Sequence, residues 1–168
     1  NLEMDDFIKS NAEHVKETYL DSANNLLNFS MFVFAFSFIT YFIALLSNNF
    51  DFGLIFELIA FILILITKNR IKNGDTSIAK ICVISSMLPV IFLIGFDLLN
   101  LILNLGEVFG EVFHYYTSID QFFYMIEPYL FDITLVVNIV LLFKAFISLK
   151  HAEGSVEKTY TDKFYDSL

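Results

Sequence analysis

Four long apolar segments, separated by short polar stretches, dominate this chain of 168 residues. The first has no charged residue and, at about 1.5 Å per residue in a helix, is long enough to cross the ~30 Å hydrocarbon core of a bilayer. The segments do not alternate apolar and polar residues as the strands of a membrane barrel do, so they predict helices. We expect an all-α membrane protein, a four-transmembrane-helix bundle with spans at about 26–47, 52–67, 78–105 and 129–149.

Three segments lie outside these spans. Residues 1–25 carry apolar positions near helical spacing and predict a short amphipathic helix, and residues 150–168 predict a second one. Residues 106–128 are rich in aromatic and acidic side chains, which is typical of a segment that lies at a membrane interface. We therefore expect a cytoplasmic amphipathic segment, a transmembrane domain over 26–149 with one long outer loop, and a cytoplasmic tail.

The basic residues determine the expected orientation. Cytoplasmic loops carry an excess of Lys and Arg, and under a four-span model every basic residue falls on one side of the membrane. This predicts both termini inside, in a cell membrane. The ten residues are Lys9, Lys16, Lys68, Arg70, Lys72, Lys80, Lys144, Lys150, Lys158 and Lys163.

The acids are distributed differently. Hydrophobic residues make up 57% of the chain, only 17% is charged, and the formal net charge is −9. Under the same topology most of that charge falls on the outer side, where it would attract cations or basic partners. Sorting of basic residues to the inside explains the absence of outer bases but not the presence of the outer acids. Those acids are Asp51, Glu57, Asp97, Glu107, Glu111, Asp120, Glu127 and Asp132.

Three of these acids interrupt the apolar segments, at about the same depth in the outer half. A charged residue at mid-membrane costs about 2.5–3.5 kcal/mol on insertion scales, so such residues mark candidate sites. Nearby amides extend two polar stripes along the third and fourth spans. We expect either a site for a cation, a proton or a cationic ligand, or acids wetted at the interface with amides that join helices. The candidates are Glu57, Asp97, Asn100, Asn104, Asp132 and Asn138.

The outer loop contains a tandem repeat, Gly-Glu-Val-Phe followed by Gly-Glu-Val-Phe, beginning at Gly106. A four-residue repeat stacks the two Phe residues and the two Glu residues on one helical face. It predicts either a segment lying on the membrane or a docking surface formed by Glu107, Phe109, Glu111, Phe113 and Asp120. Although His114 shares the face of the two Glu residues, this spacing is a weak metal pattern, and no metal is expected.

No motif for nucleotide, dinucleotide or zinc-protease chemistry is present, and the lone Cys82 excludes a two-cysteine redox relay. We expect no cofactor, no nucleic-acid partner and no enzymatic activity. The plan is similar to that of immunity proteins against pore-forming toxins and of small accessory subunits of membrane complexes, a similarity that rests on no motif. The expected function is binding of a protein partner at the acidic, aromatic outer side. The alternative is a small oligomeric cation or proton channel, or a transporter subunit, that uses the intramembrane carboxylates.

Overall fold

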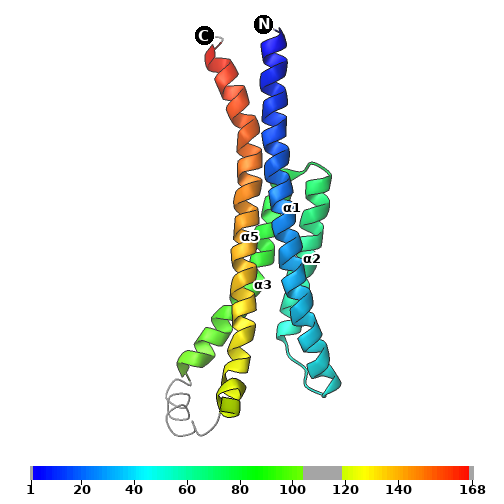
Figure 1. Ribbon diagram of the computed structural model, residues 1–168, viewed down its shortest axis with the longest axis vertical. Helices are drawn as coiled ribbons and strands as arrows, with labels where there is room; N and C mark the ends of the chain where they lie inside the picture. Colours follow the sequence, from blue (N-terminus) through cyan, green and yellow to red (C-terminus); the bar gives the residue numbers. More distant parts are fainter. Residues whose placement is uncertain (1, 104–118, 167–168) are drawn as a thin grey trace.

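The computed structural model describes residues 2–103 and 119–166, and the side chains of 2–103 and 131–155. The four helices are α1 (Leu2–Leu46), α2 (Gly53–Lys72), α3 (Thr76–Leu103) and α5 (Ile119–Asp166). They run alternately up and down, so both chain ends lie at the same end of the molecule (Figure 1). We call this the terminal end, and the opposite end, where α1 is followed by α2 and α5 begins, the distal end.

The helices form a bundle in which α1 packs on α5 and α2, and α3 packs on α2 and α5. Buried positions recur after alternately three and four residues on every helix, which is the spacing of a left-handed bundle with crossing angles of about 20°. On α1 they are Ala23, Leu27, Ser30, Phe34 and Ser37, and on α2 they are Gly53, Glu57, Ala60, Ile64 and Thr67.

The interior contains many small and several polar residues, whereas large apolar residues cover the outside. Serine, threonine and alanine fill much of the core, while phenylalanines on α1 point outward with more than 60% of their surface exposed, among them Phe29, Phe32 and Phe36. In water such an apolar surface would mark an interaction site or an aggregation hazard. In a bilayer it is the expected arrangement, because small residues let helices approach closely while lipid solvates the large ones.

Within the described part of the chain, three helical stretches are long and apolar enough to cross a membrane: α1, α3 and Phe131–Ser155 of α5. This supports the prediction of a helical membrane protein. α2 does not meet the same criterion, because its 20 residues contain Glu57 and three basic residues near its end, Lys68, Arg70 and Lys72. The apolar part of α2 is correspondingly short.

Two helices extend beyond the predicted segment boundaries. α1 continues without a break across residues 25 and 26, because the chain changes polarity there but has no Gly or Pro before Leu46. α5 begins at Ile119, includes residues 119–128 of the predicted outer loop, and continues through the position of Pro128 to Asp166. At the terminal end the rings of Tyr19 and His151 stack with centroids 5.3 Å apart, which joins α1 to α5.

α3 diverges from α2 in its distal half (Figure 1) while it stays in contact with α5. Its buried residues end at Val90, directly after Pro89 within the helix. Proline removes one backbone hydrogen bond and crowds the preceding turn, which favours a change of direction. The distal part of α3 runs away from α2 (Figure 1). Pro89 thus accounts for a bundle that is closed at its centre and open at its distal end.

Candidate functional site

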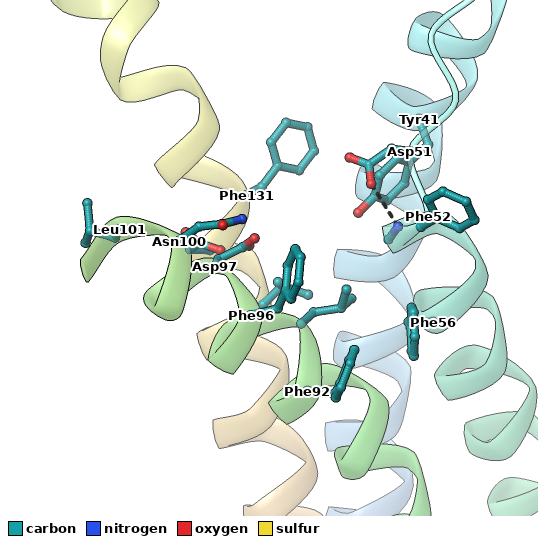
Figure 2. Close-up of a pocket in the computed structure, with 14 residues that line it drawn as sticks. Tyr41, Asp51, Phe52, Phe56, Phe92, Phe96, Asp97, Asn100, Leu101 and Phe131 are labelled. Carbon is teal, nitrogen blue, oxygen red and sulfur yellow. Dashed lines mark hydrogen bonds between the residues drawn. The ribbon is translucent and has the colours of Figure 1, made fainter. Parts of the chain in front are cut away.

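A cavity of about 690 Å³ occupies the open distal end. All four helices and the turn before α2 contribute to its lining. Its polar groups lie in two places, Asp97 and Asn100 on α3 on one side, and Tyr41 and Asp51 on the other (Figure 2). Among the described residues that line it, none is basic. They are Tyr41, Asp51, Phe52, Gly53, Phe56, Phe92, Leu93, Phe96, Asp97, Asn100, Leu101, Phe131, Asp132 and Leu135.

The first polar group is a pair of carboxyls. The side chains of Asp97 on α3 and Asp132 on α5 lie next to each other. Two neighbouring carboxylates repel each other when both are ionised, and a bound cation offsets that repulsion. The Oδ1 atom of Asp132 is buried and has no hydrogen-bond partner among the described residues. The pair therefore retains an unused acceptor beside the cavity.

The second polar group is held by the turn between α1 and α2. The backbone N–H of Gly53 donates to the Oδ1 atom of Asp51 over 2.8 Å, which places this carboxylate at the beginning of α2. A Cβ at Gly53 would come within 2.7 Å of the Tyr41 hydroxyl oxygen, closer than side chains tolerate. Glycine therefore allows Tyr41 to pack against the backbone of α2.

Glu57 is the most buried acid of the site. It lies one turn beyond Gly53 on the same face of α2, with only 1% of its surface exposed. Its carboxyl group lies next to the side chains of Tyr41 and Ser37. Its Oε2 atom has no partner among the described residues. Tyr41 thus joins the cavity to a carboxyl group inside the bundle.

A row of polar contacts continues toward the middle of the bundle. Ser37 and Thr134 lie 3.5 Å apart through their hydroxyl oxygens, and Ser30 donates to the Oδ1 atom of Asn138 over 2.9 Å. The Nδ2 atom of Asn138 is buried without a partner in the described part of the chain. Between Ser30 and the terminal end the buried core of the described residues is largely apolar. The polar row therefore does not continue to the terminal end within one copy of the protein. The residues of this layer include Leu27, Ile64, Val83, Leu142 and Leu149.

Aromatic rings form most of the remaining wall. Phe56 on α2 and Phe92 on α3 stack with centroids 5.0 Å apart and planes inclined by 22°. Tyr41 on α1 and Phe131 on α5 are 5.9 Å apart. Ring faces carry a negative electrostatic potential, so they add to the attraction that the carboxyl groups exert on a cation.

The structure brings together three of the predicted site residues at the cavity, Asp97, Asn100 and Asp132. Glu57 and Asn138 lie inside the bundle instead, fully enclosed. Asp120 belongs to α5, but its side chain lies outside the described part. Outside the described residues lie Asn104, Glu107, Phe109, Glu111 and Phe113.

Sequence reasoning did not identify the aromatic wall or the position of Asp51 at its edge. A signal was present, because Phe52 directly before α2 and Phe56 on α2 are spaced i, i+4, as are Phe92 and Phe96 on α3. In a chain with 21 phenylalanines, however, this spacing does not separate wall residues from lipid-facing ones.

Comparison of the chain with family models, with curated proteins and with solved structures finds no match. Its chemistry must therefore be inferred from the site itself. The cavity combines carboxyl groups from three places in the fold with aromatic faces, and such a combination favours a positively charged occupant.

Proposed function

We propose that this protein is a non-catalytic membrane protein that binds the cationic group of a partner in its distal cavity. The partner would be a subunit of the same membrane complex or a basic, membrane-active toxin. The observation that carries the proposal is the cavity lining, in which Asp51, Asp97 and Asp132 approach the same space from different elements without a basic side chain among the described lining residues.

The proposal includes four spans with both termini in the cytoplasm. All the basic residues of α2 and its following turn lie toward the terminal end of the bundle, and the turn between α1 and α2 has none. This asymmetry supports the positive-inside orientation, which directs the distal end outward. α2 would form the fourth span, with Lys68, Arg70 and Lys72 at the inner interface and Glu57 enclosed by its neighbours.

The residues that connect α3 to α5 in sequence extend the proposed binding surface. Glu107, Phe109, Glu111 and Phe113 follow the distal end of α3, and Asp120 is near the start of α5. Like the cavity, they combine acidic and aromatic side chains. We propose that a partner contacts these residues and inserts a basic group into the cavity.

Co-purification tests this function. With Asp97→Asn combined with Asp132→Asn, we expect the partner recovered from gently solubilised native membranes to fall at least roughly 30-fold, because a desolvated charge pair loses one member. Glu13→Gln combined with Glu17→Gln is the matched control, since both acids are exposed on α1 near the terminal end. Recovery of the same partner in equal amounts with all three proteins would reject the proposed site.

A second candidate function is a channel or transporter subunit for cations or protons. Glu57 and the polar row at Ser37 and Asn138 favour it, because they continue from the cavity to the middle of the bundle. The apolar core beyond Ser30 argues against a pore within one copy, so conduction would require oligomers. Cation flux into liposomes that contain the purified protein would favour this candidate over the first.

A further inference from the structure

The distal cavity has the properties of a site for an organic ammonium ion. We infer that its ligand is an ammonium group carried on an apolar or aromatic body, and this inference rests on the proposed function of cation binding. The cavity volume of about 690 Å³ lies within the range of about 300–1,000 Å³ that accommodates drug-sized ligands. A bare inorganic ion would leave most of that volume and nearly all of its aromatic wall unused.

The polar groups can accept the hydrogen bonds that an ammonium group donates. The Oδ1 atom of Asp132 is buried beside the cavity without a partner among the described residues, and the carboxyl group of Asp97 lies next to it. An N–H donor placed there would satisfy this acceptor and interact with the charge of the pair. Glu57 is enclosed next to Tyr41 and does not line the cavity, so it is not a contact for the ligand.

The aromatic wall suits the body of such a ligand. The stacked rings of Phe56 and Phe92 belong to different helices, and both line the cavity. Phe131 lies above Asp97 and Asn100, and Phe96 lies on the opposite side of Asp97 (Figure 2). A cation over a ring face is stabilised electrostatically, and an apolar body gains contact with the other rings.

A metal ion suits this site less well. Calcium is typically bound by about six to eight oxygen ligands at short range. Within the described residues, no three Asp, Glu, His or Cys side chains converge closely enough to hold a metal ion. Asp97 and Asp51 instead lie on opposite sides of the cavity (Figure 2), and Asp132 lies next to Asp97.

Isothermal titration of the full-length protein in lipid nanodiscs tests the inference. The probe is 2-phenylethylammonium, and its uncharged counterpart is 2-phenylethanol. We expect the ammonium to bind and the alcohol not to bind measurably. Asp97→Asn with Asp132→Asn should weaken binding at least roughly 30-fold. Phe56→Leu with Phe92→Leu should weaken it about 2- to 30-fold, the range of a cation–aromatic contact.

One control and one further variant complete the experiment. Phe32→Leu with Phe36→Leu changes two outward-facing rings and should leave ammonium binding unchanged. Asp51→Asn is a further test rather than a control: Asp51 lies in an exposed turn, so this variant tests the acidic wall even if the variant of the half-buried Asp97–Asp132 pair does not fold, and it should weaken binding several-fold.

Three results would overturn the inference: equal binding of alcohol and ammonium, displacement of the ammonium by millimolar sodium or calcium, or no ammonium binding at all. Failure of the inference is distinguishable from failure of the proposed function. If the ammonium does not bind but partner recovery still depends on Asp97 and Asp132, only the ligand class is wrong. If the ammonium binds but no partner depends on these residues, the protein-partner function is wrong.

Discussion

Phe34→Ala is expected to lower the free energy of unfolding by about 3–5 kcal/mol, the usual loss when a buried aromatic side chain is truncated. Phe34 is fully buried on α1. Its ring lies 6.3 Å from that of Phe38 and 6.5 Å, edge to face, from that of Phe61 on α2. Truncation would leave a cavity at the level of the polar row, between Ser30 and Ser37 on α1.

Phe36→Ala is the matched control for this prediction. Phe36 lies on the same helix two residues away, but 64% of its surface is exposed. In a bilayer this ring contacts lipid, so its removal changes solvation rather than packing and should cost less than about 1 kcal/mol. Steric trapping in lipid bicelles measures both free energies. Equal losses for the two variants would contradict the assignment of Phe34 to the interior.

Ala60→Phe is expected to destabilise the bundle by about 3 kcal/mol or more, the upper range of core overpacking. Ala60 is fully buried on α2, one turn beyond Glu57. A ring at this position would push α2 away from its neighbours, because a close-packed interior has no void to receive it.

Ala35→Phe serves as its control. Ala35 is exposed on α1, on the outward side of the helix. An added ring there would extend the lipid-facing surface that Phe32 and Phe36 already form, with little expected change in stability. The same steric-trapping measurement applies to both variants. A stable Ala60→Phe protein would show that α2 does not pack in the bundle as described.

The sequence was sufficient to predict the helical segments, because long stretches of apolar residues are uninterrupted by charges. The segments were visible because charges are nearly absent between residues 26 and 47 and again in the later spans. The helix ends were harder to predict from the sequence, because a change of polarity near residue 25 does not end a helix and because α5 continues through Pro128. By length and composition alone α2 does not qualify as a membrane span, because placing Glu57 and the basic residues at its end in a membrane would cost free energy.

The sequence predicted the candidate site only in part, and for a different reason. The depth of Asp97 and Asp132 in their spans followed from the predicted topology, and their similar depth suggested proximity. Their direct contact depends on how α3 and α5 are rotated about their own axes, which a single sequence does not specify. Glu57 was grouped with them, but it is enclosed one layer deeper, against Ser37 and Tyr41.

The central claim is that an acidic cavity opens to the outside, and the reactivity of a cysteine at position 100 tests it most directly. Asn100 lines the cavity, and Asn100→Cys would be studied with Cys82→Ala to remove the native thiol. The reagents are membrane-impermeant cationic and anionic methanethiosulfonates applied to intact cells. A thiol introduced as Asn73→Cys, at the opposite end of the bundle, serves as the control for sidedness.

We expect Asn100→Cys to react in intact cells and Asn73→Cys to react only after permeabilisation. Relative to a free thiol, the ratio of cationic to anionic reaction rates at position 100 should be raised at least about tenfold, because the carboxylates concentrate cations. Adding Asp97→Asn and Asp132→Asn should reduce that ratio toward the free-thiol value. A ratio equal to that of a free thiol in the otherwise native protein, or reaction at position 100 only after permeabilisation, would contradict the account.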